Sequence, residues 1–170
     1  MKKLLLVLAF APLPALAHPG GVLEHGLDAG LTHPLLGMDH LVTMLSIGLW
    51  AGLLGARARL ALPATFLAAM ALGLGLGAYG FTLPGIEQGT MASALLLVML
   101  SGLAVRLPLA TAAPLVALFG VLHGHAHGTE GAGLGFAIGA LVATAALHGV
   151  GLLLAAPVRR LRNRVLPARI

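Results

Sequence analysis

Long apolar segments separated by short polar breaks dominate the pattern of this chain. From residue 34 onward they cover about residues 34–55, 60–79, 88–105, 108–127 and 131–156. Their lengths are close to the ~20 residues that a helix needs to cross the hydrocarbon core of a bilayer. The pattern therefore predicts an all-α membrane protein in which residues 34–157 form a bundle of about five transmembrane helices.

The first 17 residues have the three regions of a secretory signal peptide. Lys2 and Lys3 are followed by the apolar run Leu4–Phe10, and small residues lead up to Ala17. We expect cleavage after Ala17. The alternative is an uncleaved first span, but prolines interrupt the apolar run, which falls short of ~20 residues.

Residues 18–33 are polar and rich in glycine, and they carry Glu24, His25 and Asp28. We expect an external segment here, either a loop or a short surface helix. Thr32 is a suitable N-cap for the first span, and Pro34 is tolerated in a first helical turn.

Charge restricts both the class and the orientation of the protein. Only 9% of the residues are charged and 59% are hydrophobic, which excludes an ordinary soluble domain. If the mature N-terminus lies outside, then Arg57, Arg59, Arg106 and the basic tail, residues 158–170, all lie on the cytoplasmic side, and the acidic residues lie outside. We therefore expect an external N-terminus and a cytoplasmic C-terminus.

The first candidate site is the motif from His33 to Asp39 and His40. On one continuous helix His33 and His40 would share a face, with Asp39 about 100° round from His40. A carboxylate within a span costs ~2.5–3.5 kcal/mol on insertion scales, so its partner must be a histidine, a proton or a cation. A purely structural Asp–His hydrogen bond is the alternative. Met44, one turn further, is expected to serve in packing.

The second candidate site lies at the end of the fourth predicted span. His123 and His127 are four residues apart and share a helix face, and Glu130 follows three residues later, while His125 points to the other side. These side chains fall at the same outer membrane level as Asp39. We therefore expect the two motifs to converge on one metal site.

The available ligand types limit the metal. The chain contains no cysteine, so imidazole and carboxylate groups must do the binding. They suit Ni²⁺, and Co²⁺, Zn²⁺ and Cu²⁺ are the alternatives. No prosthetic group is expected.

Three further residues are weaker ligand candidates. His148 lies in the fifth predicted span, ~25 Å below Gly131 at 1.5 Å per residue, and is either an inner station for the metal or a buried hydrogen-bonding residue. Glu87 either completes the entrance or favours the start of the third span through the helix dipole. His18 would belong to an external capture surface, although a solvated loop is the simpler interpretation.

At the two motifs the sequence resembles the HupE/UreJ family of nickel permeases. The matching patterns are His33 with Asp39 and His40, and His123-Gly124 with Gly128 and Glu130; Leu122 stands where the family often has an aromatic residue. The resemblance implies secondary Ni²⁺ uptake across the bacterial inner membrane and a link to hydrogenase or urease maturation. It extends over most of the mature chain.

We therefore expect a secondary transporter that imports a divalent transition metal ion, Ni²⁺ first, rather than an enzyme or a nucleic-acid-binding protein. The chain has no nucleotide-binding loop, so it contains no ATP-driven pump. Two alternatives remain open: an intramembrane zinc metalloenzyme, and a metal-sensing accessory protein of another transporter. Sequence does not decide the oligomeric state.

Overall fold

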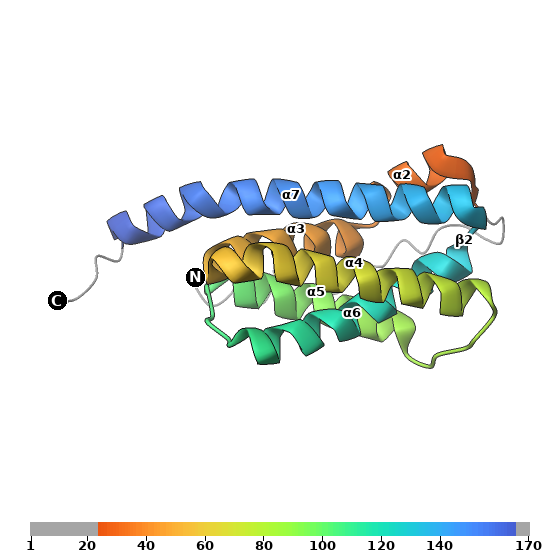
Figure 1. Ribbon diagram of the computed structural model, residues 1–170, viewed down its shortest axis with the longest axis horizontal. Helices are drawn as coiled ribbons and strands as arrows, with labels where there is room; N and C mark the ends of the chain where they lie inside the picture. The colour runs from red at the N-terminus through yellow and green to blue at the C-terminus, as the bar shows by residue number, and fades with distance from the viewer. Residues whose placement is uncertain (1–23, 166–170) are drawn as a thin grey trace, which may run out of the picture.

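The computed structural model describes residues 24–165, and within this range the chain is almost entirely helical (Figure 1). The elements in chain order are β1 (Glu24–His25), α2 (Gly26–Leu36), α3 (Met38–Leu54), α4 (Ala56–Ala78), α5 (Ile86–Gly102), α6 (Leu109–Glu130), β2 (Gly131–Ala132) and α7 (Gly133–Val165). The all-α class is thus confirmed. The predicted signal peptide and His18 lie outside the described residues.

Three helices, α4, α6 and α7, are long and apolar enough to cross a membrane. The pair α2 and α3 passes the same test jointly but is bent by 83°, and α5 is apolar but has only 17 residues. The described part of the chain thus has the helical character of a membrane protein, with three helices that could cross a bilayer, or four if the bent pair counts as one. The five-span count and the orientation remain predictions.

The first predicted span is wrong in its details. The helix that was expected from Pro34 to Gly55 stops at Leu36, and α3 starts at Met38 after an extended Gly37 (φ −86°, ψ 115°). Thr32 is not an N-cap, because it lies inside α2 and its hydroxyl donates to the carbonyl oxygens of its own preceding turn. Apolar composition cannot reveal such a break, because both sides of it are equally apolar.

Other helix bounds also differ from the predicted ones. Arg57 and Arg59, which were expected to follow the first span, stand near the start of α4. The last helix continues through Pro157 to Val165, so the basic segment begins on a helix. The expected break between the second and third predicted spans is present, but it covers residues 79–85, and residues 86–89 already belong to α5.

The helices run alternately along the long axis of the molecule, so that α4 and α6 run in one direction and α3 and α7 in the other (Figure 1). Glycines let both parallel pairs approach closely. A Cβ at Gly124 of α6 would collide with the Met70 carbonyl of α4, and one at Gly48 of α3 would collide with the His148 carbonyl of α7. These contacts fix the register of both pairs.

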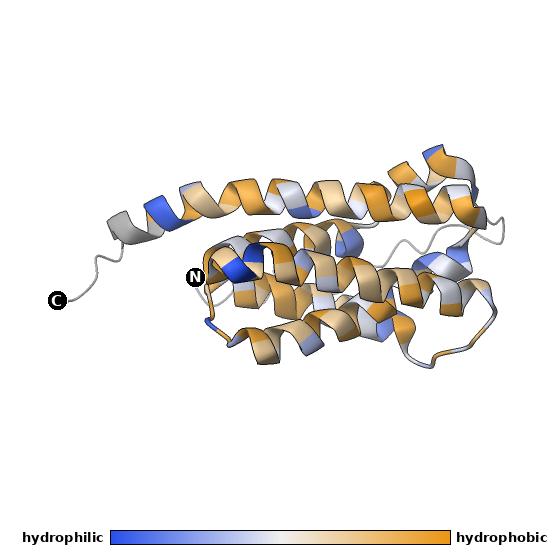
Figure 2. Cartoon of the chain, viewed as in Figure 1, coloured by the Kyte–Doolittle hydropathy of each residue, from blue (hydrophilic) through white to orange (hydrophobic). Residues whose placement is uncertain are grey.

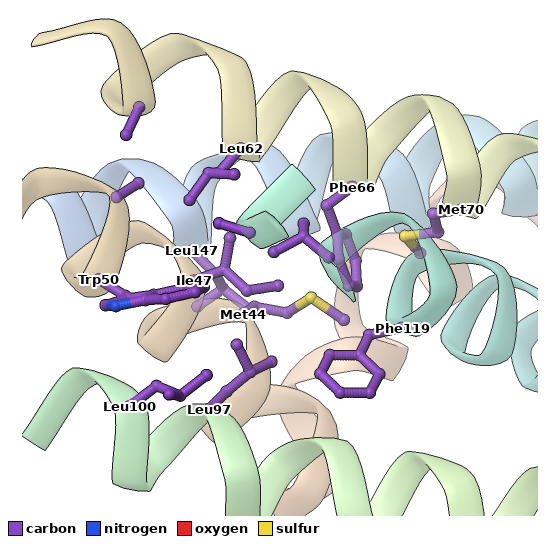
Figure 3. Packing of buried hydrophobic residues seen from close by; sticks show 14 of the residues in the cluster. Met44, Ile47, Trp50, Leu62, Phe66, Met70, Leu97, Leu100, Phe119 and Leu147 are labelled. Carbon is purple, nitrogen blue, oxygen red and sulfur yellow. The ribbon is translucent and has the colours of Figure 1, made fainter. Parts of the chain in front are cut away.

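The core between the helices is filled by large apolar side chains, among them Met44, Trp50 and Phe66, which are fully buried (Figure 3). Met44 therefore serves in packing, as expected. The Trp50 indole donates to the Val105 carbonyl oxygen at 2.8 Å, which satisfies its N–H group. Many leucines are instead exposed, as suits helices surrounded by lipid.

Charged side chains gather at the two ends of the bundle (Figure 2). Arg57, Arg59 and Arg106 lie at one end, where α4 begins and α5 is linked to α6; we call this the basic end. Asp28, Glu87 and Glu130 belong to the opposite, acidic end. A short parallel pairing of β1 with β2 joins the start of α2 to the link between α6 and α7 at the acidic end.

Candidate metal site

Four histidines from three helices meet near the break at Gly37. His33 comes from α2, His40 from α3, and His123 and His127 from α6; each is at most 9% exposed. The predicted convergence of the two sequence motifs on one place is therefore found in the structure.

The part of this cluster nearest the acidic end, which we call the outer part, contains both imidazole and carboxylate groups. His33 Nε2 lies 2.8 Å from Glu130 Oε2, and the rings of His33 and His127 are 5.0 Å apart. One ligand atom from each of these three residues fits within 4.8 Å of the others. The Glu130 side chain is 47% exposed, so the group has an anionic side that opens at the acidic end.

The inner part of the cluster consists of imidazoles alone. The His40 ring is 4.5 Å from that of His127 and 4.8 Å from that of His123. His40 Nδ1 lies 3.1 Å from Asp39 Oδ1, and this carboxylate holds the ring proton on Nδ1. His40 Nε2 therefore carries a lone pair, and it is buried without a hydrogen-bond partner in residues 24–165.

His123 is oriented by a short relay in α5. The Ser93 hydroxyl donates to the Thr90 carbonyl oxygen at 2.7 Å, and Ser93 Oγ lies 2.7 Å from His123 Nε2. Because the hydroxyl has only one proton, Nε2 must be the donor in the second bond. His123 Nδ1 is then an unprotonated acceptor, and it is buried with no hydrogen-bond partner in the part of the chain that the structure describes.

His127 lies between the two parts and contacts both His33 and His40. It is fully buried, and neither ring nitrogen has a hydrogen-bond partner among the described residues. An unsatisfied buried polar group costs about 1–3 kcal/mol. Lone pairs on His40, His123 and His127 therefore point to a ligand that accepts electron pairs, and a borderline divalent metal ion is such a ligand.

Not every predicted residue belongs to this cluster. His125 faces away, as expected, and its Nε2 donates to the Phe81 carbonyl oxygen at 2.6 Å. Glu87 is exposed in the first turn of α5 and is not part of the His33, His127 and Glu130 group. His148 lies buried on α7, where its ring is 5.2 Å from that of Phe66.

The expectation that His33 and His40 share one helix face is wrong, because the two residues lie on separate helices joined at Gly37. A Cβ at Gly37 would lie 3.2 Å from both Asp39 Oδ1 and His40 Nδ1. The glycine thus leaves room for the Asp39–His40 pair to fold back over the break. The side chains still converge, although by a different geometry.

Two residues with a place in the site were missed by sequence reasoning. Ser93 orients His123, and the Phe66 ring lies 5.9 Å from that of His123. A serine and a phenylalanine in apolar helices carry no recognisable spacing, so only the packing of α4 and α5 against α6 shows their proximity.

The fold and the cluster define an all-α membrane protein with an enclosed histidine and carboxylate group. Residues 5–169 match the family described as HupE / UreJ protein. The chain is 37% identical over 158 residues to Protein HupE of Rhizobium leguminosarum bv. viciae, and the match covers 90% of this chain and 83% of that protein. The chain belongs to the HupE/UreJ family. No solved structure matches it.

Proposed function

We propose that this protein is a secondary transporter that imports a divalent transition metal ion, with Ni²⁺ as the first candidate. The observation that carries the proposal is the enclosed convergence of His33, His40, His123 and His127 behind the Glu130 carboxylate. Membership of a family associated with nickel and cobalt transport supports it.

The ion would enter at the acidic end. Glu130, His33 and His127 form the only group of three or more carboxylate and histidine residues within metal-binding distance among the described residues, and Glu130 is accessible. From there His127 links to His40, whose Nε2 lone pair is directed by Asp39. Asp39 and Glu130 would balance the charge of the ion while the imidazoles replace part of its water shell.

The membrane potential would drive the ion inward. It is worth ~2.3 kcal/mol per elementary charge per 100 mV, and its sign favours cation entry into the cytoplasm. In the proposed orientation the acidic end faces outward and the basic end lies in the cytoplasm, in accordance with the positive-inside rule. The protein would lie in the bacterial inner membrane and supply metal to an enzyme such as hydrogenase or urease.

Uptake of ⁶³Ni²⁺ into proteoliposomes tests this proposal. His127→Gln should abolish uptake, because it removes the imidazole shared by both parts of the cluster. His125→Gln is the matched control, since a glutamine amide can still donate to the Phe81 carbonyl oxygen. Equal uptake by the two variants would overturn the proposal. A wild-type protein that binds Ni²⁺ without moving it would instead favour a metalloenzyme or a metal sensor.

A further inference from the structure

His148 lies in the middle of α7 and is only 1% exposed, and neither of its ring nitrogens has a hydrogen-bond partner within the described part of the chain. Its carbonyl oxygen is pressed against Gly48 of α3, so the backbone at this position is held by the close packing of α3 and α7. It follows Gly133, the first residue of α7, by 15 residues, which is roughly 22 Å along the helix at 1.5 Å per residue. The imidazole is therefore set well inside the bundle and away from the acidic end.

Two buried hydroxyl groups on α7 and the neighbouring α3 are also unsatisfied. Thr144, one turn before His148 on the same face of α7, and Thr43 of α3 are fully buried, and neither hydroxyl has a hydrogen-bond partner among the described residues. Buried Ser and Thr hydroxyls in helices ordinarily bond to a carbonyl of the preceding turn. Ser93 and Ser101 of α5 do so. The two hydroxyls without such a bond, those of Thr144 and Thr43, thus lie on α7 and α3, which pack against each other.

One aromatic ring connects this region with the histidine cluster. The Phe66 ring lies 5.9 Å from the His123 ring and 5.2 Å from the His148 ring. Phe66 is itself fully buried and belongs to the apolar core cluster drawn in Figure 3. Phe66 therefore lies in contact with both His123 and His148.

We propose that His148 and the Thr144 hydroxyl form a second, inner binding station for the same divalent cation, separated from the histidine cluster by the Phe66 ring. The inference rests on the proposed function. It is based on two buried groups one helical turn apart, an imidazole and a hydroxyl. Neither has a hydrogen-bond partner among the described residues.

The donors at the inner station are all neutral. Among the described residues no Asp or Glu is hydrogen-bonded to the His148 ring, whereas Asp39 and Glu130 pair with His40 and His33 in the histidine cluster. An imidazole with hydroxyl oxygens binds a divalent ion more weakly than imidazoles with carboxylates. A conducting site must bind strongly enough to admit an ion and weakly enough to release it. The inner station would thus accept the ion from the cluster and pass it toward the basic end.

Titration of the purified full chain with Ni²⁺ tests the inference independently of transport. Wild type should show a tight class of sites and a weaker one. His148→Leu should remove the weaker class and leave the tight affinity within about twofold, while His127→Gln should do the reverse. Thr144→Val should weaken the same class as His148→Leu, and Thr144→Ser, which keeps the hydroxyl, should not.

The thermal stability of the His148 variant distinguishes a binding role of His148 from a structural one. His148→Leu replaces two unsatisfied nitrogens with apolar atoms, so its thermal midpoint should equal or exceed that of wild type. Uptake of ⁶³Ni²⁺ should nevertheless fall about tenfold or more. Ser101→Ala, which removes a buried hydroxyl elsewhere, serves as a control. If His148→Leu does not fold, the two Thr144 variants decide the question.

Two outcomes overturn the inference: an unchanged Ni²⁺ isotherm in His148→Leu and Thr144→Val, or wild-type uptake in both. The proposed function fails separately. A wild-type protein that shows both classes of site but does not transport would retain the inner station and lose the transporter assignment.

Discussion

Ser93 Oγ lies 2.7 Å from His123 Nε2, and this single contact determines which nitrogen of His123 faces the cluster. Because the Ser93 proton is used on the Thr90 carbonyl oxygen, the imidazole must present an unprotonated Nδ1 to its neighbours. Groups that orient a metal-binding histidine in this way typically affect metal affinity by 10–100-fold. Ser93 is thus a positioning residue for the proposed site.

Ser93→Ala should lower Ni²⁺ affinity by about 10-fold or more, since His123 is then free to adopt the other tautomer. Nitrogen chemical shifts of the His123 ring should show a mixture of tautomers without metal, where wild type shows one. Ser101→Ala is the matched control on the same helix. Unchanged affinity together with an unchanged tautomer would contradict the relay.

Asp39→Asn should keep the fold and reduce uptake. The amide oxygen can still accept a proton from His40 Nδ1, so the geometry is preserved while the negative charge is lost. We expect uptake to fall about tenfold or more, with little change in thermal stability. Normal uptake by this variant would show that Asp39 only orients His40.

Metal binding should weaken as pH falls, because protons compete for the lone pairs that the metal needs. The sign follows from the ligand type: protonated imidazole has no lone pair. Equilibrium Ni²⁺ binding measured from about pH 7.5 down to about pH 4 covers this effect for exposed and for buried imidazoles. Binding that is constant over that whole range would argue against histidine ligands.

Gly124→Ala should destabilise the protein by about 1–3 kcal/mol, since a Cβ there would overlap the Met70 carbonyl group. Gly75→Ala is the control within α4: nothing lies within 4 Å of a Cβ at that position, so the change should be neutral or stabilising by up to ~1 kcal/mol. Thermal unfolding in detergent measures both. Equal destabilisation would mean that close contact at Gly124 is not what holds α4 against α6.

Hydropathy was sufficient to predict the all-α class and the approximate positions of α4, α6 and α7, because long apolar runs leave the chain few alternatives in a membrane. It failed at Gly37, where the chain bends between α2, which packs against α7, and α3, which packs against α7 and α5. No local feature separates a glycine that bends a helix from one that allows close packing, as at Gly48.

The candidate site shows the same difference between features local to one helix, which were predicted, and features that depend on packing between helices. Spacing predicted that His123, His127 and Glu130 share a face of α6, because that relationship is internal to one helix. The meeting of His33 and His40 with this face was also expected, but from an unbroken helix that does not exist. Ser93 and Thr144 were beyond prediction, since their significance depends on hydrogen bonds that are made or missing in the folded protein.

The break at Gly37 also has an electrostatic consequence. It places the end of α2 and the start of α3 beside the cluster, where α6 also ends. The partial negative charges at the C-terminal ends of α2 and α6 attract a cation, whereas the N-terminal end of α3 repels it. Asp39, in the first turn of α3, reverses that repulsion. With a carboxylate at this position, the ends of α2, α3 and α6 all present a negative potential to a cation in the cluster.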